Sequence, residues 1–215
     1  MVIIIGLLFS LLFLSFFAYI ATGVYANESF IVDQAIYEWI NQFATPSFTK
    51  GVVFLTELGS GKFMIPLGIL FALLLFTKLH MKRESLLLLI AIAGSVLLNE
   101  GLKLFFHRSR PELVHLVEAG GYSFPSGHAM NSFVFYGMVG FILWRLFKGM
   151  IPRTISLLVC YLLPFAIGLS RIYLGVHYPT DVVAGFAAGG FWLMACIFAF
   201  HIGKRNVYLS SSLIK

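Results

Sequence analysis

The chain has 215 residues, of which 60% are hydrophobic and only 11% are charged, and its mean hydropathy is +0.93. A soluble domain of this length would carry more charge, so the composition excludes an ordinary soluble enzyme and indicates a polytopic membrane protein. The net charge of +6 could serve nucleic acid or anionic lipid. Because the cations lie in short segments between apolar runs, we expect a lipid bilayer as the partner and no nucleic acid.

Six apolar runs predict an all-α, polytopic membrane bundle of about six transmembrane helices. Most of the runs are long enough to cross a hydrocarbon core of roughly 30 Å. In chain order they cover residues 1–21, 62–77, 85–106, 126–144, 154–172 and 180–203. The second run is the shortest, so we expect it to recruit residues from 51–56 or to lie in thinner lipid. We expect residues 1–215 to form a single integral-membrane domain, with a monomer favoured.

The first apolar run has two interpretations. Val24-Tyr25-Ala26 is a tolerable cleavage context for a secretory signal peptide. However, the run lacks the basic segment that precedes the apolar core of such a peptide. We therefore expect this helix to be retained.

The segment 30–43, between the first two spans, carries apolar residues with a helical period. They are Val32, Ile36, Trp39, Ile40 and Phe43. This spacing predicts a short amphipathic helix in the outer membrane interface, with Trp39 at the depth of the lipid headgroups. We expect a connector that rests on the bilayer, and a gate over the substrate is the alternative.

Basic residues gather after the second, fourth and sixth spans. They are Lys78, Lys82, Arg83, Arg145, Lys148, Arg153, Lys204, Arg205 and Lys215, and the same segments hold one acid, Glu84. Because cytoplasmic loops are enriched in Lys and Arg, we expect this side and both termini to be cytoplasmic. The loops after the first, third and fifth spans then face outward.

Cations accumulate at the end of the third span. Lys103 and Arg110 are seven residues apart, so we expect them to share one helix face, and Pro111 marks the exit from the helix. A lone cation at a helix end often only reaches for the interface, but further cations lie between these two. Glu100, one turn earlier, is expected to lie deep in the membrane and to pair with Lys103 or Arg110.

Pro125-Ser126-Gly127-His128 opens the fourth span. Ser126 is a natural N-cap residue, and Gly127 lacks the side chain that would keep an anion away from the backbone. The N–H groups of the first helical turn then form an anion site, from which His128 projects. An ordinary transition from loop to helix explains the first three residues but does not explain His128.

The fifth span closes with Ser170-Arg171, and His177 precedes the sixth span by a short turn. Asp181 lies four residues after His177, so its carboxylate can accept a hydrogen bond from one ring nitrogen while the other faces the site. Such an imidazole is a nucleophile or a base. A structural hydrogen bond or a metal pair is the alternative, although the remaining histidines and acids supply no plausible further metal ligands.

Gly185 and Gly189 form a GxxxG pattern in the sixth span. Small residues four apart let another helix approach closely. We expect this contact to lie within the chain and to hold the His177–Asp181 end rigid, with dimerisation as the alternative.

Together these blocks resemble the type 2 phosphatidic acid phosphatase (PAP2) superfamily. Lys103-x6-Arg110-Pro111, Pro125-Ser126-Gly127-His128 and Ser170-Arg171-x5-His177-x3-Asp181 match all three of its signature blocks, in order, within residues 103–181. The six-span layout resembles the membrane members, which include bacterial phosphatidylglycerophosphatase B and undecaprenyl pyrophosphate phosphatases. The resemblance implies a lipid phosphatase of the cell membrane that needs neither a metal nor another cofactor.

The resemblance also implies a role for each motif residue. His177 would attack phosphorus and form a phosphohistidine, Asp181 would orient its ring, and His128 would act as general acid and then as general base. The phosphate oxygens would be bound by Lys103, Arg110, Ser126, Gly127 and Arg171. Support would come from Glu100, Pro111, Pro125 and Ser170.

Three other functions stay open at this point. A lipid phosphotransferase would pass the phosphoryl group to an alcohol, a vanadium haloperoxidase would hold vanadate in the same anion cage, and a transporter or binder would not cleave the lipid at all. Among the phosphatase substrates we favour phosphatidylglycerophosphate, with undecaprenyl pyrophosphate second and phosphatidate and lysophosphatidate open. We expect the site to face the extracytoplasmic side.

Overall fold

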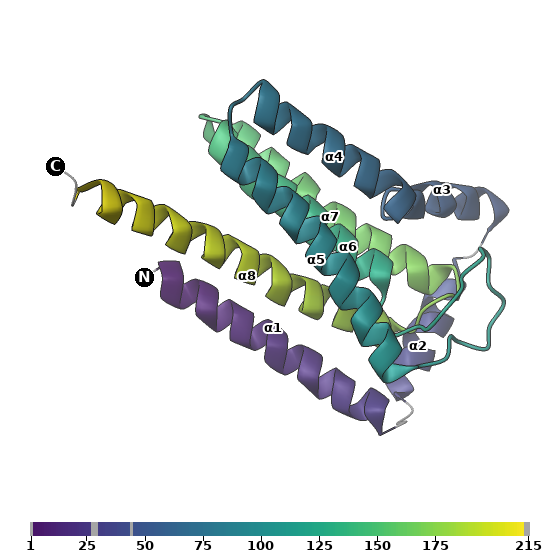
Figure 1. Ribbon diagram of the computed structural model, residues 1–215. Helices are drawn as coiled ribbons and strands as arrows, with labels where there is room; N and C mark the ends of the chain where they lie inside the picture. Colours follow the sequence, from purple (N-terminus) through teal and green to yellow (C-terminus); the bar gives the residue numbers. More distant parts are fainter. Residues whose placement is uncertain (1, 27–29, 44, 213–215) are drawn as a thin grey trace.

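The computed structural model describes residues 2–26, 30–43 and 45–212. Within these ranges the chain forms eight helices and no strand, which confirms the all-α expectation (Figure 1). The helices are α1 (Val2–Tyr25), α2 (Ile31–Asn41), α3 (Pro46–Glu57), α4 (Gly61–Thr77), α5 (Lys82–Phe106), α6 (Gly127–Leu146), α7 (Met150–Tyr173) and α8 (Pro179–Ser212). Lys215, which we counted among the basic residues of the last segment, lies outside the described residues.

The helices account for five or six membrane spans, as the hydropathy predicts. Among the described residues α1, α5, α6, α7 and α8 each contain a stretch long and apolar enough to cross a bilayer. Helices α3 and α4 pass the same test only as a pair, with a bend of 43° between them. The short second run therefore does join the preceding residues, because 51–56 lie in α3. Residues 31–41 form the separate helix α2, as expected.

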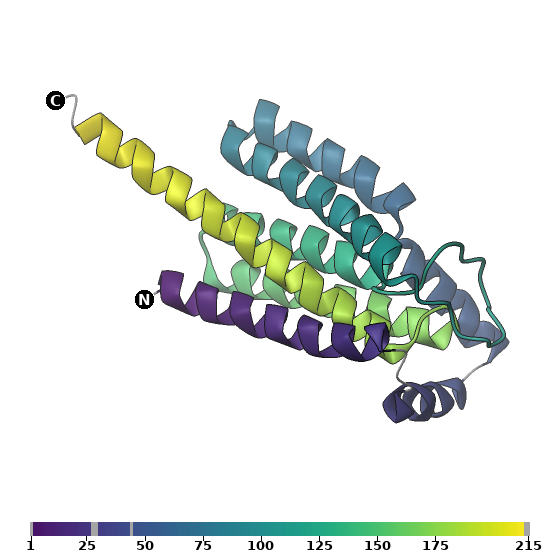
Figure 2. The same cartoon turned by 60° about the horizontal axis from the view of Figure 1, so that its bottom comes forward.

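Helix α6 is the centre of the bundle. It packs against α5, α7 and α8, while α4 lies along α5 and α1 lies along α8 (Figures 1 and 2). Most of its side chains are buried, including Met130, Val134, Met138 and Ile142. The chain therefore builds its core around the helix that starts with Gly127 and His128.

Two glycines of α8 explain how closely it approaches α6. A Cβ atom on Gly185 would lie 2.7 Å from the backbone oxygen of Ser126, and one on Gly189 would lie 2.8 Å from the backbone oxygen of Met130. Both neighbours are backbone atoms, which cannot turn away. The GxxxG pattern therefore packs inside the chain, as expected, and it holds the first turns of α6 and α8 together.

The bundle has two different ends (Figure 1). At one end lie the segments between α4 and α5 and between α6 and α7, where Arg145 pairs with Glu84 at 3.3 Å. At the other end lie α2, the long segment 107–126 and the turn that joins α7 to α8. The basic segments and the PAP2-like motifs thus occupy opposite ends.

Candidate active site

Helix α5 ends earlier than the spacing of its cations suggests. His107 takes a left-handed conformation (φ 50°) and caps the helix after Phe106, so Arg110 lies in the following segment and does not share a helix face with Lys103. That expectation is wrong, although the folded chain still brings both cations to one site. The ammonium of Lys103 pairs with Glu100 at 3.1 Å. The pairing agrees with the expectation from the sequence, and the Glu100 side chain is 60% exposed on the surface of the bundle.

Arg110 is held by backbone oxygens beside the catalytic candidate His177. Its guanidinium donates to Gly120, Gly121 and Val176, at 2.7 to 3.1 Å. Its Nη1 lies 3.3 Å from His177 Nε2. Burial lowers the pKa of Arg110, and its attraction to Asp181 opposes this shift. The next residue, Pro111, is buried where the chain turns.

The start of α6 brings its polar groups to the same place. Ser126 stands at the N-cap position, but its hydroxyl accepts no capping hydrogen bond; the Oγ atom is buried without a hydrogen-bond partner among the described residues. The expected capping role of this side chain is therefore wrong. The preceding peptide, Phe124-Pro125, is cis, and the carbonyl of Pro125 accepts from Asn99 at 3.2 Å.

Gly127 makes room for two side chains of α5. A Cβ atom there would lie 2.8 Å from Asn99 Oδ1 and 3.6 Å from Lys103 Nζ. The next residue, His128, lies close to the bend between α3 and α4, because a Cβ atom on Gly59 would be 3.3 Å from its ring. The charges of Lys103 and Arg171 both act on the His128 imidazole. The first turn of α6 is therefore surrounded by cations.

Arg171 reaches the site from the last turn of α7. Its residue is only 5% exposed, and its Nη1 donates to Thr56 Oγ1 of α3 at 2.9 Å. Its Nε is buried without a hydrogen-bond partner among the described residues. The neighbouring Ser170 turns the other way and donates to the carbonyl of Ile167 in its own helix. The structure thus places Arg171 in the site but directs Ser170 into helix α7.

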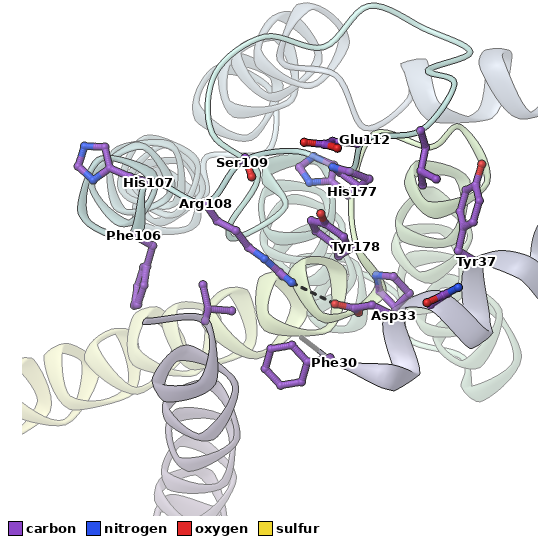
Figure 3. Close-up of a pocket in the computed structure, with 15 residues that line it drawn as sticks. Phe30, Asp33, Tyr37, Phe106, His107, Arg108, Ser109, Glu112, His177 and Tyr178 are labelled. Carbon is purple, nitrogen blue, oxygen red and sulfur yellow. Dashed lines mark hydrogen bonds and ion pairs between the residues drawn. The ribbon is translucent and has the colours of Figure 1, made fainter. Parts of the chain in front are cut away.

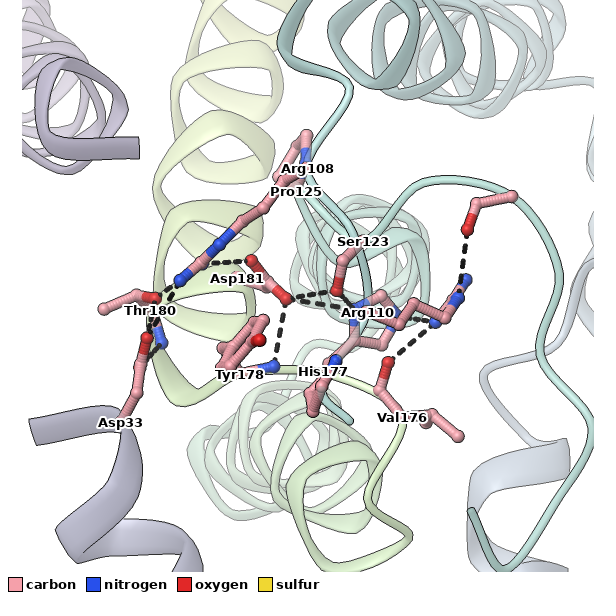
Figure 4. A network of polar contacts seen from close by, with 12 residues as sticks. Asp33, Arg108, Arg110, Ser123, Pro125, Val176, His177, Tyr178, Thr180 and Asp181 are labelled. Carbon is pink, nitrogen blue, oxygen red and sulfur yellow. Dashed lines mark hydrogen bonds and ion pairs between the residues drawn. The ribbon is translucent and has the colours of Figure 1, made fainter. Parts of the chain in front are cut away.

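His177 and Asp181 lie at the start of α8, and Ser123 bridges them (Figure 4). The His177 Nδ1 atom is 3.5 Å from Asp181 Oδ2 and 3.3 Å from Ser123 Oγ. The Ser123 hydroxyl donates to the same carboxylate oxygen at 2.5 Å. The Nδ1 side of the ring is therefore occupied, and Nε2 points toward Arg110.

The surroundings keep the His177 ring neutral. The pKa of His177 is lowered to about 4, mainly by burial and to a smaller extent by the charges of Arg110 and Arg171, against the opposing effect of Asp181. An imidazole with that pKa is unprotonated at neutral pH, so its Nε2 lone pair is available for attack.

Sequence reasoning missed several side chains that complete the site. Asp181 is fully buried, and its second oxygen, Oδ1, accepts from Arg108 Nη1 at 2.6 Å. Further contributors outside the three motifs are Asp33, Thr56, Asn99, Ser123 and Thr180. The signal for Arg108 was visible as an extra cation between Lys103 and Arg110, but its partner lies 73 residues away.

A cavity adjoins His177 on the side of α2 (Figure 3). It measures ≈ 590 Å³ and is bounded by the end of α1, by α2 and by the segment after α5. Its polar lining includes Gln34, Tyr37 and Glu112. The residues Lys103, Ser126, His128 and Arg171 do not line it, so the cavity lies beside the ring of cations and not within it.

Within the described ranges no group of three or more His, Cys, Asp or Glu side chains could hold a metal ion. The charges around the two histidines are instead those of three cations, Lys103, Arg110 and Arg171, while a fourth cation, Arg108, pairs with the carboxylates of Asp181 and Asp33. Such a set suits a phosphate group.

Comparison with known proteins agrees with this chemistry. The sequence profile of the PAP2 superfamily matches residues 84–205, which is more than half of the chain. The chain belongs to the PAP2 superfamily. It is 31% identical to phosphatidylglycerophosphatase B of Bacillus subtilis over 176 residues, which covers 81% of this chain and 86% of that protein. It is 32% identical to an undecaprenyl-diphosphatase of Sulfolobus acidocaldarius over 194 residues, which covers 85% and 84%.

The fold is shared with a solved PAP2 protein. The crystal structure of a transmembrane PAP2-type phosphatidylglycerolphosphate phosphatase from Bacillus subtilis has a TM-score of 0.79 and 28% sequence identity. The match covers 87% of this chain and 93% of that one. The present PAP2 chain is thus a multi-pass membrane enzyme of the lipid phosphatase class.

Proposed function

We propose that this PAP2 protein hydrolyses the terminal phosphate of a membrane lipid through a phosphohistidine on His177. The observation that carries the proposal is the state of that ring. His177 is buried and neutral, its Nδ1 side is held by Ser123 and Asp181, and its Nε2 faces the guanidinium of Arg110. A neutral, oriented imidazole beside a phosphate-binding cation is equipped for attack on phosphorus.

The first step transfers the phosphoryl group to the protein. The Nε2 lone pair of His177 forms a bond to phosphorus while the bond from phosphorus to the lipid oxygen breaks. In its protonated form, His128 donates a proton to the departing lipid oxygen. Asp181, through Nδ1 and Ser123, stabilises the positive charge that develops on the ring.

The second step releases inorganic phosphate. His128, now unprotonated, takes a proton from a water molecule as its oxygen attacks phosphorus, and the bond from phosphorus to Nε2 breaks. Both histidines return to their starting protonation states, which closes the cycle.

The phosphate oxygens are bound by cations and by two unsatisfied polar atoms. Lys103, Arg110 and Arg171 supply the charge, and Gly127 supplies a backbone N–H at the start of α6. The buried Ser126 Oγ and Arg171 Nε have no hydrogen-bond partner among the described residues. Since buried polar groups are normally paired, both are suited to a ligand oxygen.

We propose phosphatidylglycerophosphate as the substrate and undecaprenyl pyrophosphate as the second candidate. The first is supported by the Bacillus subtilis relative, whose name specifies that activity and whose length the match covers to 86%. The second is supported by the Sulfolobus acidocaldarius relative. Purified protein in one detergent, with EDTA present, should release phosphate from both lipids, and kcat/KM should be higher for phosphatidylglycerophosphate.

A trapped intermediate tests the mechanism separately. Rapid quenching with radiolabelled substrate should yield an acid-labile, base-stable phosphoprotein in the wild type and none in His177→Ala. Phosphate release without any phosphoenzyme would contradict the nucleophile assignment. Absence of phosphate release from both lipids and from phosphatidate would contradict the phosphatase itself.

We propose that the site faces the extracytoplasmic side and that both termini are cytoplasmic, within one domain that spans 1–215. The support is the separation of the basic segments from the motif end of the bundle. A membrane-impermeant thiol reagent should label Glu118→Cys in intact cells and should label Lys148→Cys only after permeabilisation. Both positions are exposed, and the reverse pattern would overturn the orientation.

A further inference from the structure

Helix α2 meets the catalytic end of α8 through one buried carboxylate (Figure 3). Asp33 is only 5% exposed. Its Oδ1 accepts the backbone N–H of Thr180 at 2.8 Å, and its Oδ2 accepts the Thr180 hydroxyl at 2.7 Å. Helix α8 begins at Pro179, so Asp33 caps the N-terminus of a different helix, where an anion is stabilised by the helix dipole.

Arg108 connects the same carboxylate to the catalytic one (Figure 4). Its Nη2 donates to Asp33 Oδ2 at 3.1 Å, and its Nη1 donates to Asp181 Oδ1 at 2.6 Å and to Thr180 Oγ1 at 2.8 Å. Its guanidinium also lies 4.1 Å from the centre of the Tyr178 ring. It is 5.8 Å from the centre of the Phe30 ring, so Arg108 is held between two carboxylates and two aromatic rings.

These contacts decide which oxygen of Asp181 serves His177. With Oδ1 occupied by Arg108, the other oxygen, Oδ2, is directed to Ser123 and to the imidazole Nδ1. Without Arg108, a fully buried carboxylate would lose its paired cation and could rotate or take up a proton. Either change would misalign the His177 ring, although Arg108 and Asp33 act on it only through Asp181.

We propose that Asp33 and Arg108 are positioning residues of the active centre, and that α2 is the element that aligns His177 through Arg108 and Asp181. This inference rests on the phosphohistidine mechanism proposed above. It gives the segment 30–43 a role beyond that of a connector.

The mechanism predicts a loss in kcat with little change in KM, because the phosphate-binding cations are untouched. Asp33→Asn should lower kcat about 10-fold and Arg108→Gln about 100-fold, since each removes a charge-assisted hydrogen bond, while KM stays within about twofold. The double variant should be no slower than Arg108→Gln, because both residues act along one route.

Matched controls lie on the same helix and at the far end of the bundle. Glu38→Gln alters an exposed acid of α2 whose side chain accepts a hydrogen bond from Gln34 on the same helix. Lys148→Gln removes an exposed cation. Both should keep wild-type kcat. Each rate is divided by the folded fraction from size-exclusion chromatography. If Asp33→Asn does not fold, Thr180→Val replaces it in the test, because this variant loses the hydroxyl but keeps the N–H bond to Asp33.

The acidic limb of the kcat profile distinguishes positioning from simple loss of structure. Rotation or protonation of Asp181 in the absence of Arg108 would weaken its stabilisation of imidazolium, so the limb should move to lower pH. The other charged groups that face His177, which are Asp181, Arg110, Arg171 and His128, are unchanged in this variant. A purely structural residue would lower the rate equally at every pH.

The outcomes separate this inference from the proposed function. No phosphate release by the wild type would remove the proposed function itself. If the wild type is active and Asp33→Asn and Thr180→Val have the same kcat as the control Glu38→Gln, the positioning role alone is overturned. The positioning role is also overturned if the fold-losses in kcat of the two single variants multiply in the double variant. The same holds if the loss of activity equals the loss of folded protein and the acidic limb does not move.

Discussion

The two ends of this bundle use charged residues in opposite ways. At the basic end, exposed cations such as Arg83 and Lys148 face the surroundings singly, and the one ion pair there, among described residues, joins Arg145 to Glu84. At the motif end, Arg171 and Asp181 are buried, Arg108 is half-buried, and all three form hydrogen bonds with residues of distant segments. In our proposal, the charges at the first end determine the orientation in the membrane, whereas those at the second end take part in the reaction.

This contrast has a physical reason. A buried ion is costly unless it is paired, so each cation at the motif end needs several fixed partners. Those partners come from α2, α3 and α8 and from the segments that follow α5 and α7. An exposed cation needs no such partner, and its replacement changes little.

The largest effect should follow from removing the proposed nucleophile at the motif end. His177→Ala should lower kcat by at least about 10⁴-fold, because no other imidazole occupies its position. Initial rates of phosphate release with folded protein measure the loss. Residual turnover within tenfold of the wild type would instead move the attack to another group or to water.

A conservative change should separate the ends almost as clearly. Arg171→Lys keeps the charge but loses the planar fork that serves both Thr56 and a phosphate oxygen, so kcat/KM should fall about 100-fold. The same replacement at the basic end, Arg83→Lys, should leave kcat/KM unchanged. Equal effects in the two variants would remove the distinction between them.

The pH profile sharpens the comparison through His177. Its pKa of about 4 means that the neutral nucleophile persists well below the ordinary pKa of 6.5 and is lost only as the pH falls through about 4. At pH 5 the neutral fraction should be about 30-fold larger than for an ordinary histidine. A kcat/KM limb near pH 6.5 would show that the ring is not shielded as the structure indicates.

Helix packing gives a smaller effect, on stability. Gly185→Val would drive a side chain into the backbone oxygen of Ser126, and such overpacking costs about 1–3 kcal/mol. Its melting temperature in detergent should fall together with activity. The control is Gly51→Ala in α3, where a Cβ atom meets nothing within 4 Å, and which should be neutral or slightly stabilising.

The smallest effect should come from the ion pair at the basic end. Glu84→Gln removes the pairing with Arg145 and should lower stability by about 1 kcal/mol or less, without altering kcat/KM. A clear loss of activity in this variant would mean that the two ends are coupled through the bundle.

The sequence predicted the spans and the motif residues because both depend on short patterns. Apolar runs identify helices wherever they occur, and spacing identifies His177 with Asp181. Prediction from the sequence failed for side chains whose hydrogen-bond partners come from distant segments of the chain. No local pattern indicates that Asp33 contacts the start of α8 or that Thr56 contacts the end of α7. Both contacts depend on how the helices pack. The shared face of Lys103 and Arg110 failed for a local reason, the left-handed His107 that ends α5.

The glycines of α8 also set the register in which this helix packs along α6. Gly185 fits against Ser126 and Gly189 against Met130, so α8 can settle along α6 in one register. A slip by one turn would carry Asp181 about 5.4 Å along the axis, away from the turn of α6 that bears His128. The absence of side chains at Gly185 and Gly189 thus sets the position of Asp181 relative to the turn that bears His128.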